Sequence, residues 1–196
     1  MNLLTEITRR LDNMIRLGTI AEVDHGDPAQ QKMPLCRVTT GAITTGWLPW
    51  FNLRAGTTRI WNPPTLNEQC MVFSPSGDPA QGIVLLGLNS TENPAPSNSP
   101  AKDLTTYPDG ALIEYDHVAH HLRAILPPKG TTELESLGGI SIKGPITHEG
   151  DYTQTGNQNV TGKVTVSVDV IAAGVSLVNH KHTGVTAGNA QTGNPV

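Results

Sequence analysis

Aromatic residues are scarce in this chain of 196 residues: they make up 4% of it, and apolar residues of all kinds make up 37%. Large side chains supply most of the area that a globular core buries, so these fractions are small for an ordinary globule. Glycine (20 residues) and proline (15 residues) are frequent by contrast. Many turns and few large side chains favour short strands or an extended structure over a helical globule.

Basic residues are also too few for some classes of partner. Lysine and arginine number 13 against 17 aspartates and glutamates, which gives a formal net charge of -4. Because binding to phosphates needs clustered cations, this balance argues against nucleic acid and against an anionic membrane surface as partners. The first residues, MNLLTEITRRLDNMIRL, are charged throughout. We therefore expect neither a signal peptide nor a spanning helix there.

Motifs of catalysis and of redox chemistry are missing from the sequence as well. It has no P-loop, HExxH or CxxC pattern and no recognisable Ser-His-Asp order, so we expect a protein that is not an enzyme and has no small-molecule substrate. The two cysteines, Cys36 and Cys70, stand far apart in a chain without a predicted secretion signal. They are expected to be small buried side chains in strands rather than a disulfide.

A single amphipathic helix is predicted over residues 1–17. Its apolar positions fall on one helical face, and Gly18 is expected to end it; they are Leu3, Leu4, Ile7, Leu11, Met14 and Ile15. The apolar face has two possible uses. It packs on its own domain, or it docks the chain into a larger assembly.

Residues 18–90 are predicted to form a small closed barrel of the oligonucleotide/oligosaccharide-binding (OB) kind. Runs such as LCRVTTGAITTGWLPW, QCMVFSPSG and QGIVLLGL are rich in β-branched residues and separated by turn signals, which indicates about five strands. Trp47, Trp50 and Phe51 cluster near the middle of this region. Core packing or subunit contact suits them better than base stacking, because few cations surround them.

The remainder of the chain differs in kind. Residues 91–106, TENPAPSNSPAKDLTT, are predicted to be a linker. Residues 107–196 contain short β-patterned runs with glycines at the bends. In GKVTVSVDV, the valines at 164, 166, 168 and 170 alternate with polar residues, and Ile140 and Ile142 share one face in GGISIKG. We call the apolar positions Ile140, Ile142, Val164, Val166, Val168 and Val170 the apolar strip.

A single copy of this second part cannot build a core, because its strands have open edges and few large side chains to offset the backbone entropy of ordering. The economical solution is a homotrimer in which the strips of three chains meet on a shared axis. The predicted fold is therefore all-β: an N-terminal helix, an OB-like barrel, and an intertwined triple-stranded β-helix over residues 107–196. A single-chain solenoid would need a fixed repeat of ~20–30 residues, and we find none.

The stretch VNHKHTG holds the candidate metal ligands, His180 and His182. Residues two apart on a strand point to the same side, so both imidazoles are expected to face the axis. Three copies then supply six nitrogens in two stacked triangles. Iron(II), or nickel, suits such a cage better than zinc, which prefers four ligands. Residues 183–196 are expected to fold back over the metal or to form a short cap.

Other polar clusters are assigned no site. His117, His120 and His121 in DHVAHH are expected to be solvated, as are His25 and His148. The carboxylate pairs Glu133/Glu135 and Glu114/Asp116 are spaced as a glycosidase pair could be, but charges on a solvated face are expected instead.

The helix, the GWLPW barrel, the linker, the stretch ITHEGDYTQTG and the terminal HKHTG together resemble the baseplate spike proteins of contractile-tailed phages, the baseplate assembly protein V family, which also includes R-type bacteriocin tail spikes. The resemblance implies a homotrimer with one iron(II) on the threefold axis, held by six histidines, His180 and His182 of each chain. It implies docking to the baseplate hub and tail tube, assembly in the bacterial cytoplasm, and transient piercing of the outer membrane of the target cell when the sheath contracts.

Two other functions stay open at this point. The first is a nucleic-acid-binding OB-fold protein with a β-rich tail, against which the acidic balance counts. The second is a metalloenzyme that uses the two histidines, which would need an open coordination position.

Overall fold

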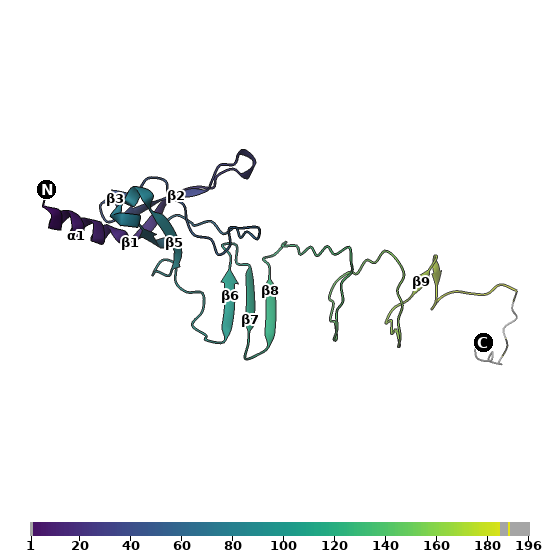
Figure 1. Cartoon of the computed structure of the whole chain (residues 1–196). Coiled ribbons are helices and arrows are strands. Elements are labelled where there is room, and N and C mark those ends of the chain that lie inside the picture. The colour runs from purple at the N-terminus through teal and green to yellow at the C-terminus, as the bar shows by residue number, and fades with distance from the viewer. Residues whose placement is uncertain (1, 185–187, 189–196) are drawn as a thin grey trace. The chain divides into compact units, whose positions relative to one another are not determined.

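The computed structural model describes residues 2–184 and 188 (Figure 1). Residues up to Glu135 form one compact unit, and the chain from Ser136 onward forms a second. Within the described residues, no helix is both long and apolar enough to cross a membrane. The first unit contains, in chain order, α1 (Leu3–Met14), β1 (Ile15–Asp24), η1 (Pro28–Gln30), β2 (Leu35–Thr40), β3 (Ile43–Thr44), β4 (Gln69–Phe73), η2 (Pro75–Gly77), η3 (Pro79–Gln81), β5 (Ile83–Leu88), β6 (Lys102–Thr106), β7 (Leu112–Asp116) and β8 (His121–Ile125).

The predicted N-terminal helix is present, but it ends earlier than expected. Asn2 caps it by accepting a hydrogen bond from the Leu4 N–H, and the backbone turns to β conformation at Ile15. The expectation that Gly18 ends the helix is wrong, because Gly18 lies inside β1. A side chain at position 18 would lie 2.7 Å from the Thr39 carbonyl oxygen. Glycine is needed there for close strand contact rather than for helix termination.

Five antiparallel strands form one sheet in the order β3-β2-β1-β4-β5, which confirms the expected strand count. The segment from Leu48 to Phe51 joins the two sides of this sheet. Leu48 exchanges two backbone hydrogen bonds of 2.8 Å with Cys36 on β2, and the Phe51 N–H donates to the Val84 carbonyl on β5 over 2.9 Å. The sheet is thereby closed, as an OB barrel requires.

The barrel encloses one small apolar core. Alternate residues of β2 and β4 point inward, as the period of a strand requires. Both cysteines are free and buried, which confirms that they are small core residues. Burial raises the pKa of the Cys36 thiol to about 11 and that of Cys70 to about 12. The buried core comprises Ile20, Cys36, Val38, Leu48, Trp50, Cys70, Val72 and Val84.

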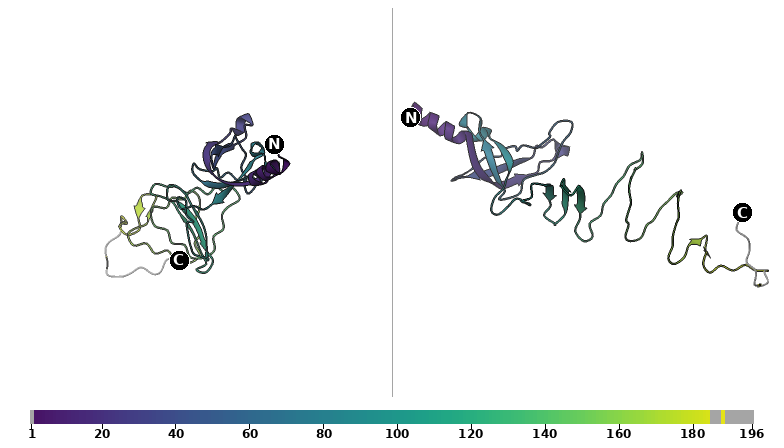
Figure 2. Two further views of the ribbon diagram at one scale, coloured as in Figure 1. Left: turned by 90° about the vertical axis from the view of Figure 1, so that its left-hand side faces the viewer. Right: turned by 90° about the horizontal axis from the view of Figure 1, so that it is seen from below.

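A separate antiparallel sheet has the order β6-β7-β8, and its strands lie side by side in Figures 1 and 2. Its first strand begins at Lys102, inside the range 91–106 for which a linker was predicted. On the central strand, Glu114 is only 6% exposed. It accepts from Lys102 over 2.8 Å and from Arg123 over 3.3 Å, one partner on each neighbouring strand.

The expectation that Glu114 lies on a solvated face is therefore wrong. Strand pairing places Arg123 directly opposite Glu114 and Leu104 on its other side, with Lys102 reaching across from two residues away. The carboxylate is compensated by two cations, which permits its burial.

A pH dependence follows from this ion pair. Lys102 and then Arg123 hold the pKa of Glu114 below its ordinary value of 4.5. A carboxylate with a lowered folded-state pKa stabilises the fold above its unfolded pKa, and that stability is lost as the pH falls through the folded pKa. We expect Glu114→Gln to melt several degrees below the unsubstituted protein at pH 7. The difference should shrink when melting is followed by circular dichroism below pH ~4.5. A constant difference would contradict this account.

The second unit is described as an extended chain with little regular structure. Its strands are β9 (Ile171–Ala172) and β10 (Val175–Ser176), joined by a tight turn in which Ala173 and Gly174 both have positive φ. Such a two-residue turn is the preferred hairpin connection. Glycines were predicted at the bends of this part of the chain, and Gly174 lies in the turn of this hairpin.

The predicted strands of the apolar strip are not formed in this single chain. Residues 126–170 contain no strand in the described structure, and the ribbon there repeatedly reverses direction (Figure 1). Glycines 144, 150, 156 and 162 recur every six residues, each with φ between 111° and 143°. The strip itself is exposed: Ile142 by 68%, Val164 by 71% and Val168 by 83%. A regular bend pattern is present, but among the described residues these runs have no neighbouring segment with which to form a sheet.

Candidate functional site

The two predicted ligands, His180 and His182, lie next to one another. Their ring centroids are 5.1 Å apart, and the rings are nearly perpendicular, at 82°. Residues 180–182 are not in a strand, so the argument from strand alternation does not apply as stated. The two imidazoles lie close together, and their common orientation toward a shared axis stays a prediction.

The hairpin of β9 and β10 positions His180. The His180 N–H donates to the Ser176 carbonyl over 3.1 Å. The ring Nδ1 lies 3.0 Å from the same carbonyl oxygen and 3.2 Å from that of Leu177. A carbonyl oxygen can only accept, so Nδ1 carries a hydrogen, and in the neutral ring Nε2 is then the nitrogen with the lone pair. A backbone carbonyl that fixes the tautomer in this way is the usual support of a metal-bound histidine.

Asp169 forms hydrogen bonds to the backbone on both sides of this hairpin. Its carboxylate accepts from the Val170 N–H over 2.8 Å and from the Val178 N–H over 3.2 Å. A hydrogen bond from Ser176, followed by those from the backbone, lowers the pKa of Asp169. Neither Asp169 nor Ser176 was singled out from the sequence. The available signal was a pair of turn-forming polar residues on either side of Ala173-Gly174.

The remaining candidates are not brought together. Within the described residues, no group of three or more His, Cys, Asp or Glu side chains is arranged to hold a metal. Asp116 instead caps a turn by accepting from the Val118 and Ala119 N–H groups. His25 packs edge-on against Trp61 at 6.2 Å, and His148 packs likewise against Tyr152 at 5.9 Å.

The aromatic cluster divides between core and surface. Trp50 is buried, and its ring lies 6.1 Å from that of Trp61. Trp47 and Phe51 are exposed, and the Arg37 guanidinium lies 5.9 Å from the Trp47 ring centre. Core packing is thus confirmed for Trp50, while subunit contact stays a prediction for Trp47 and Phe51.

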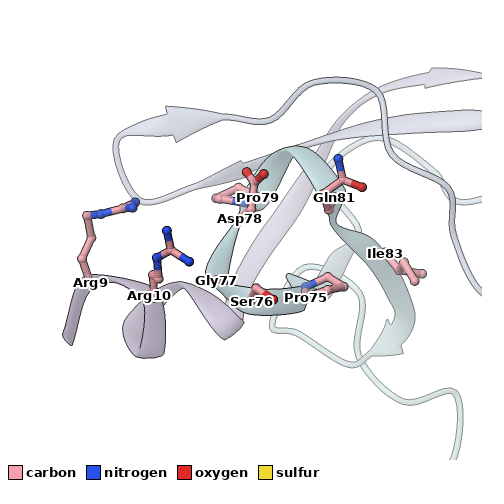
Figure 3. A pocket seen from close by; sticks show the side chains of 9 residues that line it. All are labelled: Arg9, Arg10, Pro75, Ser76, Gly77, Asp78, Pro79, Gln81 and Ile83. Atoms are coloured by element: carbon pink, nitrogen blue, oxygen red, sulfur yellow. The ribbon is translucent and has the colours of Figure 1, made fainter. Parts of the chain in front are cut away.

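A hollow of about 680 Å³ lies between α1 and the loop that contains η2 and η3 (Figure 3). Arg9 and Arg10 line it on the helix side, and Asp78 and Gln81 line it on the loop side. The hollow is open and carries charges of both signs, so it does not select one class of ligand.

Two family models match separate parts of the chain. The family described as type VI secretion system/phage-baseplate injector OB domain matches residues 16–88. The GpV Apex motif matches residues 174–196, a range that includes His180 and His182.

A curated relative, the spike protein of Escherichia phage P2, is 40% identical over 113 residues. The match covers 58% of this chain and 51% of the relative, so the chain spans about half the length of that protein. One family model matches the barrel, a second matches the segment with the paired histidines, and a spike protein shares 40% of the aligned residues, so this chain is similar to phage baseplate spike proteins.

Proposed function

We propose that three copies of this chain form the membrane-piercing spike at the centre of a contractile-tail baseplate. Residues 107–196 of the three copies wind into a triple-stranded β-helix, and their apolar strips meet on the axis. The barrels, over residues 18–90, dock to the hub and the tail tube. When the sheath contracts, the tube drives the tip through the outer membrane of the target cell. The part is mechanical and involves no catalysis.

The observation that carries the proposal is that exposed apolar residues and regularly spaced bends occur in the same segment. Ile142 and Val168 are 68% and 83% exposed, in a segment that pairs with no other part of the chain that the structure describes. Bends six residues apart leave straight segments of ~20 Å, at the strand rise of ~3.3 Å per residue. Three chains that pair along such segments satisfy their backbone groups and bury the valines and isoleucines together.

Iron(II) at the tip is the second part of the proposal. His180 and His182 fit a metal because the Ser176 and Leu177 carbonyls leave Nε2 of His180 free. Two histidines are too few for a closed site, and the other two copies supply four more. The ion acts structurally, because it crosslinks three chains at one point. A tip closed by six imidazoles leaves no open position for metalloenzyme chemistry.

The metal assignment is tested with His182→Ala. Elemental analysis of the unsubstituted protein should find about one iron per three chains, and the variant should contain none. The variant should stay trimeric by light scattering, because the metal acts only at the tip. Lys181→Ala, between the two ligands, is the matched control and should keep its iron. Retained iron in His182→Ala would refute the site, and zinc at three ions per trimer would indicate separate sites.

Nucleic-acid binding by the barrel is the other candidate kept from the sequence. The net charge of -4 and the similarity to a phage spike protein both weigh against it. A salt-dependent shift of DNA in a gel would support it.

A further inference from the structure

Helix α1 turns its polar side toward its own domain. Asn13 on this side is 9% exposed and accepts from Arg16 over 2.9 Å, and Arg16 also donates to Thr40 of β2. The backbone at Arg10 rests on Gly77 of η2. A Cβ at position 77 would lie 2.6 Å from the Arg10 Cα, so only glycine allows this approach. The barrel therefore fixes how the helix is rotated about its own axis.

The apolar side of the same helix faces away from the barrel. Leu4, Ile7, Leu11 and Met14 are exposed by 70%, 45%, 61% and 44%. We call these four residues the helix stripe. They are spaced three, four and three residues apart, which is the a/d spacing of two coiled-coil heptads. Leu3, 73% exposed, widens the stripe on one side.

The charges next to the stripe are neutralised within the helix. Arg10, adjacent to the stripe, donates to Glu6 over 2.7 Å, and Arg9 donates to the same carboxylate. The hydrogen bonds from Arg9 and Arg10 lower the pKa of Glu6 to about 2, so these ion pairs persist at any physiological pH. Copies of this helix can therefore approach one another along the stripe without meeting unpaired like charges.

We propose that the α1 helices of three copies meet along the helix stripe in a short parallel coiled coil. In a parallel homotrimer each stripe residue faces its own counterparts, and all four layers of this stripe are apolar, as self-pairing requires. The proposal rests on the trimer proposed above. A helix of 12 residues is too short to associate alone, but chains already joined elsewhere hold it at high effective concentration. The copies would then be tied near the beginning of the chain as well as near its end.

Cysteine crosslinking tests this arrangement in the full-length protein. Leu11→Cys places a thiol on the stripe, and Asp12→Cys places one on the neighbouring exposed position outside it. Under mild oxidation, Leu11→Cys should form a covalent pair in each trimer, several-fold more than Asp12→Cys, on a non-reducing gel. The native Cys36 and Cys70 are 0% exposed and do not interfere. Ile7→Cys is a second stripe position, in case Leu11→Cys disturbs assembly.

The outcomes separate this proposal from the trimer itself. If light scattering shows a trimer and neither stripe variant crosslinks more than Asp12→Cys, the coiled coil is refuted and the stripe is left to a different baseplate protein. If the unsubstituted protein is a single chain, the trimer and the coiled coil both fail.

Discussion

Replacing Ile142 and Val166 together by aspartate is expected to convert the assembly to single chains. Both side chains belong to the apolar strip, and in one copy they are 68% and 48% exposed. In the proposed trimer they face a shared axis, where three carboxylates per layer would have to be buried without partners. An uncompensated buried charge destabilises by several kcal/mol (~3–5), and two such layers exceed what the remaining strip can offset. Multi-angle light scattering reads the result directly.

The matched control introduces the same charge on the opposite face of the predicted strands. Thr165→Asp and Ser141→Asp together carry the same two carboxylates on the opposite face, next to the strip in sequence. This variant should assemble as the unsubstituted protein does. If both double variants assemble equally well, the strip does not lie on a shared axis.

Leu48→Ala is expected to have the largest effect on the barrel. Leu48 is 1% exposed and lies on the segment that closes the sheet between β2 and β5. A Cβ on Gly82 would lie 2.9 Å from the Leu48 Cδ1, so little space is available there. Removing a buried leucine side chain lowers the free energy of unfolding by ~2–5 kcal/mol, and more where the site cannot collapse.

Denaturant unfolding followed by the fluorescence of the buried Trp50 measures this loss. Leu53→Ala is the control on the same connecting segment, since Leu53 is 88% exposed and its truncation should change stability by less than ~0.5 kcal/mol. Equal unfolding midpoints for the two variants would show that the closing segment does not pack the core.

The barrel could be anticipated because its signals are local. The β-branched runs, the turn residues between them and the alternation in β2 all describe single strands, and each was found. Closure depends on Leu48 and Phe51 meeting partners 12 and 33 residues away in the chain, Cys36 and Val84. Nothing in the residue types at positions 48–51 specifies those partners, so closure was expected only by analogy with five-stranded barrels.

Glu114 shows why buried charge is hard to infer. A glutamate indicates a solvated position unless its cations are known. Here the partners Lys102 and Arg123 come from separate strands, and only the register of β6, β7 and β8 brings them to one carboxylate. The rings of His180 and His182 lie close together, and their common orientation toward a metal stays a prediction. The Ser176 carbonyl that orients the His180 ring is placed by the turn after β10. The only sequence signal for that turn is Ser176 itself.

For the apolar strip, the sequence predicts structure that the single chain does not form. Its pattern predicts strands, yet residues 126–170 hold none in the described structure. A strand forms only where a neighbouring strand pairs with its backbone N–H and C=O groups. Alternating valines predict a strand, but they do not specify which segment pairs with it. The proposed trimer would supply this neighbour from other copies of the chain.

Native mass spectrometry of the purified full-length protein tests the central claim most directly. Three chains that share one apolar axis should appear as a single species of three times the chain mass, carrying one iron ion. A species of one chain mass, at concentrations where the protein remains folded, would contradict the account.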